Sequence, residues 1–298
     1  MKLRRVLVVF KKSSYTVYAR ERRDPTFIRL LKEKDALIRR FLPSHGAHAE
    51  SLRIVRDVLT CRGIRAKYVN RATPFSDRGM DLVVTVGGDG TFLEASHSVL
   101  RAPILGVNSS PKDSVGIFCG AIAEEFQETL DRIEAGRMPY VALSRFFVRL
   151  NGRRAGVPVA NEVLIAHRNP ANTTRYFIRQ RTKEEQHKSS GVWIATAVGS
   201  TAAIGSAGGR ILPLRSSSVQ YLVREPYSPP GRHPRIRGGI VAPGGKFSLR
   251  SKMRAGVIFL DGSHLTLPFP MGTRLEIDVS APRLKVFGFS ERRWRRFL

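Results

Sequence analysis

The segment Leu82-Val83-Val84-Thr85-Val86-Gly87-Gly88-Asp89-Gly90-Thr91 joins a short apolar run to a glycine-rich turn. The run is continuous and rich in valine, which is typical of a strand buried on both faces of a parallel sheet. Residues 92–100, directly after the turn, have the pattern of a helix. A strand, a glycine turn and a helix in this order predict an α/β unit that binds its ligand at the carboxyl end of the strand.

Strands and helices alternate on both sides of this segment. Further strands are predicted at residues 3–10, 64–69 and 104–107, and helices at residues 25–41, ended by Pro43, and at residues 48–61, closed by Gly63. This alternation favours βαβ units with helices on both faces of a parallel sheet. We therefore expect an α/β fold, with a Rossmann-like doubly wound N-terminal domain over residues 1–142.

The hydrophobic pattern of the sequence changes near Leu143. Long helical patterns before it are followed by short apolar runs separated by Gly, Pro and Asn. This spacing predicts a mostly antiparallel β-sandwich C-terminal domain over residues 143–298. Its expected strands lie at residues 146–150, 157–165, 176–181, 192–196, 219–223, 255–260, 265–267, 275–279 and 284–287.

Composition excludes several classes of protein. The 298 residues include 51 Lys plus Arg against 24 Asp plus Glu, a net charge of +27. Arginine is scattered along the chain, so the charge fits coding bias as well as an anionic partner. No pattern of a specific nucleic-acid-binding module accompanies it. No apolar run is long enough for a membrane span, and two cysteines make no disulfide framework, so we expect a cytoplasmic protein without a membrane partner.

The glycine turn has the chemistry of a phosphate cradle. Glycines let the backbone approach an anion, and the N–H groups of Gly87, Gly88, Gly90 and Thr91 are candidate donors at a helix N-terminus. The turn is neither the dinucleotide motif nor a P-loop. An aspartate in such a turn would repel phosphate, so it needs a role of its own: a Mg²⁺ ligand or a base toward a hydroxyl. The alternative is that Asp89 only caps the helix.

The turn resembles a motif shared by NAD kinases, 6-phosphofructokinases, and the diacylglycerol and sphingosine lipid kinases. Two later segments select among these families. Asn161-Glu162 resembles the Asn-Glu motif of NAD kinases. Gly199-Ser200-Thr201-Ala202, continuing to Ser206-Ala207-Gly208-Gly209, resembles their second glycine-containing segment.

Three departures from the commonest bacterial type resemble the mitochondrial-type NAD kinase branch and its bacterial relatives. About three extra residues lie between Asn108 and Gly116. Ser190 stands where many members have Asp, and Ala203 stands where many have Tyr. No role is carried over from the missing Asp and Tyr.

The resemblance implies an enzyme that uses ATP to phosphorylate the adenosine ribose 2′-hydroxyl of NAD, giving NADP. It implies Asp89 as the catalytic base, Mg²⁺ bound with the nucleotide phosphates, and a homodimer or homotetramer. Polyphosphate is an alternative donor. The isolated histidines make no metal set, so no protein metal site is expected. The NAD-binding residues that the resemblance implies are Asn108, Asn161, Glu162, Thr201, Ala202 and Ser206.

Each assignment has an alternative. A lipid kinase of the diacylglycerol or sphingosine class would share the glycine turn but not the two later segments, and an inactive nucleic-acid-binding module would use only the charge. Asn161 and Glu162 could be a polar kink in a strand. Asn108 could cap a turn, and Ser200 or Thr201 could cap a helix.

Overall fold

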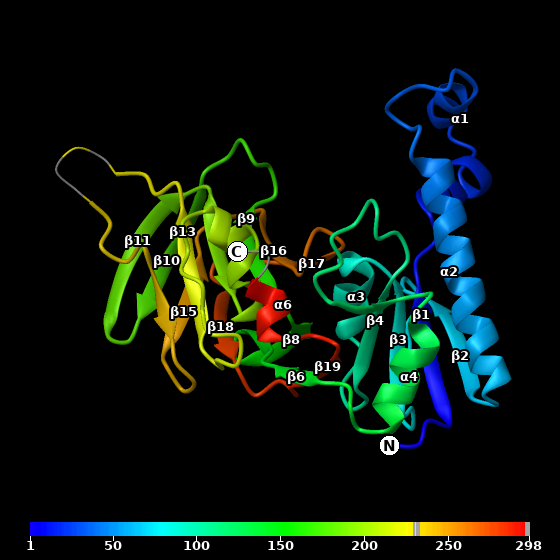
Figure 1. Cartoon of the computed structure of the whole chain (residues 1–298). Coiled ribbons are helices and arrows are strands. Elements are labelled where there is room, and N and C mark those ends of the chain that lie inside the picture. The colour runs from blue at the N-terminus through cyan, green and yellow to red at the C-terminus, as the bar shows by residue number, and fades with distance from the viewer. Residues whose placement is uncertain (229, 231–232, 296–298) are drawn as a thin grey trace. The chain divides into compact units, whose positions relative to one another are not determined.

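The computed structural model describes residues 1–228, 230 and 233–295, and these form two compact units (Figure 1). Of the described residues, the first unit comprises Met1–Val141 and residues 285–295, and the second comprises Ala142–Leu284. The predicted domain boundary, after residue 142, lies one residue from the end of the first segment of the first unit at Val141. The structure differs from the prediction at the C-terminal end, where the chain returns to the first unit.

The first unit is built on a seven-stranded sheet of order β2-β1-β3-β4-β19-β6, with β5 beside β4. Five pairs in this sheet are parallel: β1 with β2, β1 with β3, β3 with β4, β4 with β5, and β4 with β19. The strands are β1 (Arg5–Phe10), β2 (Arg65–Asn70), β3 (Leu82–Gly87), β4 (Ile104–Asn108), β5 (Cys119–Ile122), β6 (Tyr140–Leu143) and β19 (Leu284–Phe287).

Helices cover both faces of this sheet, as predicted for a doubly wound fold. Buried residues of α2 and α4 share one apolar cluster with alternate residues of β1, β3 and β4. The intervening strand residues are buried toward the opposite face, where α3 contacts the same strands. The helices are η1 (Thr16–Glu21), α1 (Pro25–Lys32), α2 (Phe41–Cys61), α3 (Asp89–Ser96), α4 (Phe126–Glu134) and α6 (Glu291–Arg295).

The expectation that Pro43 ends a helix is wrong. The helix predicted for residues 25–41 is the short α1, and α2 begins at Phe41 with Pro43 in its first turn. A proline is tolerated there because the first N–H groups of a helix have no intrahelical acceptor. Asp24 caps α1 by accepting the Phe27 N–H at 2.7 Å.

The second unit contains two six-stranded sheets, of order β11-β10-β15-β18-β7-β8 and β14-β13-β12-β9-β16-β17. Every pairing in them is antiparallel, and their inward side chains form one apolar core, as the sandwich prediction requires. The strands are β7 (Phe146–Leu150), β8 (Arg153–Val159), β9 (Glu162–His167), β10 (Thr174–Gln180), β11 (Lys183–Ser189), β12 (Gly191–Ala195), β13 (Val219–Arg224), β14 (Gly238–Val241), β15 (Phe247–Ser251), β16 (Gly256–Leu260), β17 (Leu265–Pro268) and β18 (Arg274–Asp278).

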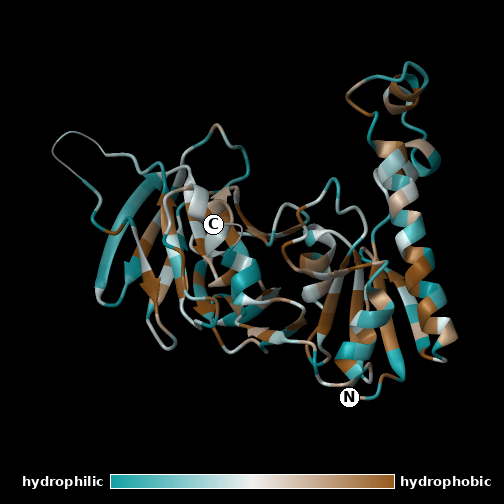
Figure 2. Cartoon of the chain, in the orientation of Figure 1, coloured by the Kyte–Doolittle hydropathy of each residue, from teal (hydrophilic) through white to brown (hydrophobic). Residues whose placement is uncertain are grey.

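Several strand assignments differ from the prediction. No strand is predicted at β5, β6, β14 or β15. The run at residues 157–165 is divided between β8 and β9 by a turn at Ala160 and Asn161. The strand predicted at residues 284–287 is β19, which pairs parallel with β4 in the first sheet. β11 was not predicted because its sequence, Lys-Glu-Glu-Gln-His-Lys-Ser, is hydrophilic along its length (Figure 2). Within the described residues, no helix is both long and apolar enough to span a membrane.

Candidate active site

The glycine turn lies where the fold places ligands, between the carboxyl end of β3 and the start of α3. Gly88 has an extended backbone and is the N-cap of α3. A Cβ on Gly87 would collide with the Thr91 side chain, and one on Gly88 would lie 2.8 Å from Ser114 Oγ. The close approach of Thr91 therefore requires glycine at residue 87, whereas at residue 88 the Ser114 side chain would have to rotate away. The turn places the N-terminus of α3 at the carboxyl edge of the sheet, where an anion is stabilised.

One of the four predicted phosphate donors is already used within the turn. The Thr91 N–H donates to the Gly88 carbonyl at 3.0 Å. The Thr91 hydroxyl is buried beside Gly87, and none of the residues that the structure describes forms a hydrogen bond with it. Phosphate binding by the amides of Gly87, Gly88 and Gly90 stays a prediction.

Asp89 does not cap its own helix, so the capping alternative is wrong. Its Oδ2 accepts the Ile117 N–H at 2.9 Å and its Oδ1 accepts the Phe118 N–H at 2.8 Å. Asp89 thereby fixes the end of the loop at residues 109–118, which includes the extra residues that the sequence shows. Two amide donors orient the carboxylate, and an ionised carboxylate keeps further lone pairs for a substrate hydroxyl.

Asn108, at the end of β4, supports the same loop. Its Nδ2 donates to the Ser114 carbonyl at 2.9 Å, and its Oδ1 accepts the Ser110 N–H at 3.1 Å. Gly116 packs against this side chain with φ +61°, a conformation that favours glycine. The turn-capping interpretation of Asn108 describes these contacts, and its predicted contact with NAD stays a prediction.

Two cationic residues that the sequence analysis did not single out lie at the same edge of the sheet: Arg71 lies close to the glycine turn, and Lys11 lies near Arg71. Lys11 follows β1 and Arg71 follows β2, so both belong to the carboxyl edge that carries the turn. Burial, and next the charge of Arg71, lower the pKa of Lys11. Arg71 Nε pairs with Glu94 of α3 at 2.9 Å, and its Nη1 lies 3.7 Å from the place of a Cβ on Gly90. The available signal was a basic residue close behind each of two predicted strands: Lys11 directly after residues 3–10, and Arg71 two residues after the strand at 64–69.

His48 connects the backbone directly after β1 to the loop at residues 109–118. Its Nε2 donates to the Lys11 carbonyl at 2.7 Å, which leaves Nδ1 to accept the Ser109 hydroxyl at 2.9 Å. Burial lowers the pKa of His48 to about 4, so the imidazole is neutral at neutral pH. We assign His48 to positioning the residues after β1 and β4.

In the second unit, Asp261 organises the turn that carries Asn161 and Glu162. Its carboxylate accepts three consecutive amides, those of Ala160 at 2.8 Å, Asn161 at 2.7 Å and Glu162 at 2.9 Å. The Asp261 N–H returns a hydrogen bond to the Glu162 carbonyl at 2.9 Å. The sequence analysis missed Asp261, which lies about 100 residues from its partners. The turn is thus a fixed element, and the polar-kink interpretation correctly describes its backbone.

Glu162 is half-buried, and its carboxylate oxygen Oε2 has no hydrogen-bond partner among the described residues. Burial raises the pKa of Glu162 to about 7, although hydrogen bonds from the amides of Ile204 and Ala203 favour its charged form. It also lines a cavity of about 300 Å³ on the second unit. An acceptor without a donor at the edge of a cavity fits a ligand hydroxyl. The other residues of the cavity lining are Leu164, Trp193, Phe259, Gly262 and Ser263.

The segment after β12 packs on this turn. A Cβ on Gly199 would overlap the Asn161 carbonyl oxygen, so only glycine permits the close approach. The segment forms η2 (Val198–Thr201) and the short helix α5 (Ala203–Ser206), whose N-cap is Ala202. The expectation that Ser200 or Thr201 caps this helix is therefore wrong.

The hydroxyl groups of this segment differ in their accessibility to a ligand. Ser200 is buried, where its Oγ donates to Ala197 at 2.7 Å and accepts the Leu212 N–H at 3.0 Å. Thr201 donates weakly to Val198 at 3.3 Å, and Ser206 is exposed. Gly208, with φ +91°, follows α5 in a tight turn. The predicted NAD contacts of Thr201, Ala202 and Ser206 stay predictions.

The structure brings the predicted residues together in two sets. Gly87, Gly88, Asp89, Gly90 and Thr91 share the carboxyl edge of the first sheet with Asn108. Asn161 and Glu162 share a turn in the second unit with Asp261 and contact the segment that begins at Gly199. Each set is fixed by hydrogen bonds or close contacts within its own unit.

The residues at the glycine turn fit a metal that arrives with a nucleotide. No group of three His, Cys, Asp or Glu in the described part of the chain could hold a metal ion. Asp89 accepts two amides and Glu94 pairs with Arg71. Mg²⁺ is usually held by one or two carboxylates together with substrate phosphates, which matches this sparse acidic set.

The doubly wound sheet and the glycine turn after β3 define the first unit as an α/β domain with a candidate phosphate site. Comparison with known proteins names the family. The model of the ATP-NAD kinase N-terminal domain matches residues 6–138. The chain is 36% identical over 264 residues to the "Probable NADH kinase" of Oryza sativa subsp. japonica, covering 80% of this chain and 81% of the relative. The chain belongs to the NAD kinase family, which confirms the predicted resemblance.

Other relatives agree with this assignment. The chain is 32% identical to the "NADH kinase" of Arabidopsis thaliana, over 80% of this chain and 83% of the relative. It is 27% identical to "NAD kinase 2, mitochondrial" of Mus musculus, over 63% of this chain and 44% of that relative.

Solved structures have the same fold. A crystal structure of an NAD kinase from Archaeoglobus fulgidus in complex with ATP aligns with a TM-score of 0.68 and 20% identity, covering 98% of this chain and 96% of that one. Yeast NADH kinase complexed with NADH aligns with a TM-score of 0.72 and 16% identity, over 99% of this chain and 86% of that one.

Proposed function

We propose that the chain transfers the γ-phosphoryl group of ATP to the 2′-hydroxyl of the adenosine ribose of NAD or NADH, giving NADP or NADPH. The observation that carries this proposal is the glycine turn with Asp89 at the carboxyl edge of the first sheet, in a chain that belongs to the NAD kinase family. The reduced acceptor is included because two relatives are named as NADH kinases. No observation favours the lipid kinase alternative.

In this proposal Asp89 is the catalytic base. Its carboxylate takes the proton of the 2′-hydroxyl while the hydroxyl oxygen bonds to the γ-phosphorus, and the bond from phosphorus to the bridging oxygen of ADP breaks. An aspartate is a weak base, with an ordinary pKa of about 3.9, so its contribution comes from placement. The amides of Ile117 and Phe118 supply that placement, because they hold both carboxylate oxygens.

Charge neutralisation is the second requirement of phosphoryl transfer. The amides at the N-terminus of α3, with Lys11 and Arg71 at the same edge of the sheet, supply positive charge for the phosphates of the substrates. Mg²⁺ bound to the nucleotide phosphates would neutralise further charge on the transferring group. Asp89 and Glu94 are the nearby carboxylates that could help to hold it.

Asn161 and Glu162 orient the dinucleotide. Glu162 Oε2 is the acceptor for a ribose hydroxyl, because no described residue donates a hydrogen bond to it. Asn161 offers both a donor and an acceptor from a backbone that Asp261 fixes. Asn108, Thr201, Ala202 and Ser206 complete the proposed NAD-binding set.

Three further expectations accompany the proposed reaction. We expect the enzyme to work as a homodimer or homotetramer, as its resemblance to the family implies. We also expect it to be cytoplasmic, because its two cysteines fit a reducing compartment. Polyphosphate is the alternative donor. Size-exclusion chromatography with light scattering and a donor comparison under identical conditions test the first and the third.

Product formation tests the function. The purified chain is incubated with ATP and Mg²⁺ and with NAD, NADH or diacylglycerol as the acceptor. We expect NADP or NADPH and no phosphatidic acid, and we expect excess EDTA to abolish turnover. Phosphorylation of the lipid, or undiminished turnover in EDTA, would contradict the proposal.

A further inference from the structure

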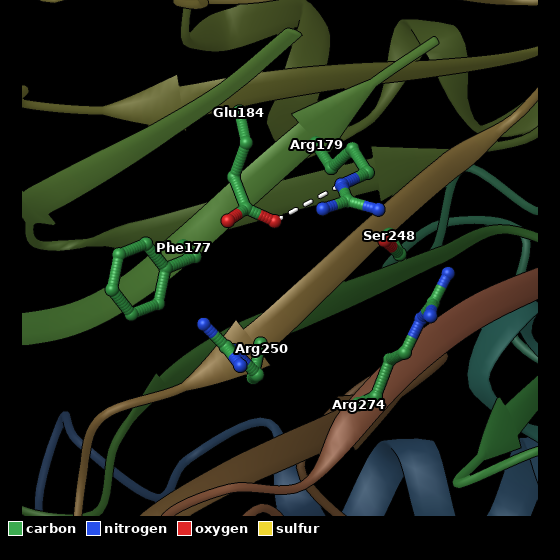
Figure 3. Close-up of a pocket in the computed structure, with 6 residues that line it drawn as sticks. All are labelled: Phe177, Arg179, Glu184, Ser248, Arg250 and Arg274. Carbon is green, nitrogen blue, oxygen red and sulfur yellow. Dashed lines mark hydrogen bonds and ion pairs between the residues drawn. The ribbon is translucent and has the colours of Figure 1, made fainter. Parts of the chain in front are cut away.

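A basic pocket lies on the outer face of the sheet that contains β10, β15 and β18 (Figure 3). We call it the outer basic pocket. It has a volume of about 100 Å³ and belongs entirely to the second unit. None of its residues belongs to the proposed active site. Its lining consists of Phe177, Arg179, Glu184, Ser248, Arg250 and Arg274.

The strand register places two arginines directly opposite each other. Arg250 of β15 is paired with Phe177 of β10 on one side and with Arg274 of β18 on the other. Like charges in directly opposite positions of an antiparallel pair are destabilising. This cost is reduced only where counter-charges are present.

Carboxylates of the described residues pair with two of the three arginines of the pocket but not with Arg250. Arg179 pairs with Glu184 at 3.0 Å, as the dashed line in Figure 3 shows, and Arg274 pairs with Glu276 at 2.9 Å. Across the described part of the chain, no carboxylate pairs with Arg250, whose guanidinium carbon lies 4.7 Å from the centre of the Phe177 ring. The pocket thus retains a positive charge without a partner.

The next row of side chains on the same face adds more positive charge. Arg175 of β10 is paired with Lys188 of β11, and the Lys252 N–H donates to the Arg175 carbonyl. Lys252 Nζ lies 5.0 Å from the centre of the Phe177 ring and donates to Gln186 at 2.9 Å. This row and the row of Phe177, Arg250 and Arg274 hold five cations and no carboxylate.

The shape and chemistry of the pocket favour a compact oxyanion over a nucleic acid. A volume of about 100 Å³ equals that of about three water molecules, which is too small for a nucleoside. Phe177 is a poor platform for a base, because cations already lie over its ring. Guanidinium groups match the geometry of phosphate or sulfate oxygens. Ser248, which lies between Arg179 and Arg274 in Figure 3, adds a hydroxyl group to the lining.

We propose that the outer basic pocket binds a phosphate-class oxyanion between Arg250 and Arg274. The anion neutralises Arg250. It accepts hydrogen bonds from Arg250, from Arg274, which also pairs with Glu276, and from the Ser248 hydroxyl. A free phosphate ion and a terminal phosphate group of a larger molecule share this chemistry. The site is independent of the proposed reaction.

Calorimetric titration with inorganic pyrophosphate tests the proposal. The wild type is compared with Arg250→Gln/Arg274→Gln and with the control Arg29→Gln/Arg39→Gln, which removes two exposed arginines from the first unit. We expect the pocket variant to lose one binding site per chain, or to bind there at least about tenfold more weakly, while the control does not change. Kinase turnover should be equal in all three proteins, and thermal melts confirm folding.

A second variant tests whether the guanidinium geometry of Arg250, and not only its positive charge, contributes to pyrophosphate binding. Arg250→Lys keeps the charge but loses the guanidinium fork, so pyrophosphate should bind more weakly than to the wild type but more tightly than to the double variant. Equal numbers of sites and equal affinities in the wild type and the double variant would overturn the proposal. Binding of duplex DNA that requires the same arginines and that pyrophosphate does not displace would overturn it as well.

Discussion

Asp261 Oδ1 accepts the Asn161 N–H at 2.7 Å and, together with Oδ2, holds three consecutive amides of the turn between β8 and β9. The residue that immobilises the predicted NAD-binding turn is therefore an aspartate from the end of β16. This relationship makes the geometry of Asn161 and Glu162 depend on one distant carboxylate.

The first prediction concerns Asp261. Asp261→Ala leaves the amides of Ala160, Asn161 and Glu162 without their acceptor, and each buried amide that stays unpaired costs about 1–3 kcal/mol. We expect a loss of at least about 2 kcal/mol of unfolding free energy and a KM for NAD that rises more than the KM for ATP. Chemical denaturation and steady-state kinetics measure both effects.

The control for Asp261 is Asp57→Asn, which removes an exposed carboxylate from α2. Its unfolding free energy should stay within about 1 kcal/mol of the wild type, because an exposed ion pair contributes little. Equal increases in both KM values for Asp261→Ala would show that Asp261 stabilises the fold without positioning the NAD site.

The second prediction concerns pH. The native pKa of Glu162 is about 7 against an ordinary value of 4.5, so between these values the folded protein holds a proton that the unfolded chain releases. The contribution of Glu162 to stability is complete below pH 4.5 and is lost as pH rises through 7. Glu162→Gln should therefore be more stable than the wild type at pH 8, by at most about 3 kcal/mol, with little difference at pH 4.5.

Denaturation of both proteins across this pH range measures the difference. A constant gap between wild type and Glu162→Gln would contradict the raised pKa. NAD binding provides an independent check, because the charged carboxylate is the better acceptor for a ribose hydroxyl. We therefore expect the wild type to bind NAD more tightly at pH 8 than at pH 6, with a smaller change in the variant.

The third prediction concerns Lys11. Lys11→Met removes a cation at the same edge of the sheet as the glycine turn, and kcat/KM should fall by at least about tenfold, which corresponds to one charge-assisted hydrogen bond. Lys12 is the matched control, because it is the next residue but pairs with Glu21. If Lys12→Met reduces kcat/KM as much as Lys11→Met does, the effect is one of general charge and not of the site.

The sequence predicts the parts of this fold that depend on local pattern. The apolar run before Gly87 identifies β3, and alternation of strands and helices identifies the doubly wound sheet. Pro43 misled the prediction because proline ends a helix only in its interior. β11 has no apolar pattern, because its outer face is solvated and its inner face uses a buried histidine, His187.

Long-range contacts could not be predicted in the same way. Asp89 and Asn161 are recognisable from their motifs, but their partners are not. Ile117 and Phe118 contribute only backbone amides to Asp89, and any residue but proline has such an amide. Asp261 reaches Asn161 across about 100 residues, and only the pairing of β16 with β9 brings them together.

Asp89→Asn separates catalysis from the structural role of this residue. A carboxamide keeps one acceptor for the amides of Ile117 and Phe118 but presents an NH₂ group to the other, so we expect a loss of about 1–3 kcal/mol of unfolding free energy. NAD should still bind, because the substitution removes a negative charge near its phosphates. Asp89→Ser is the comparison variant, since it shortens the side chain and also removes the base.

The most direct test of the central claim follows the label from [γ-³²P]ATP into product with the wild type and Asp89→Asn, each shown to be folded and to bind NAD. We predict that the wild type places the label on the 2′-position of the adenosine ribose. We also predict that the turnover of Asp89→Asn is at least about 100-fold lower, as expected for loss of a general base. Label at another position, or an Asp89→Asn enzyme with wild-type turnover, would contradict the account.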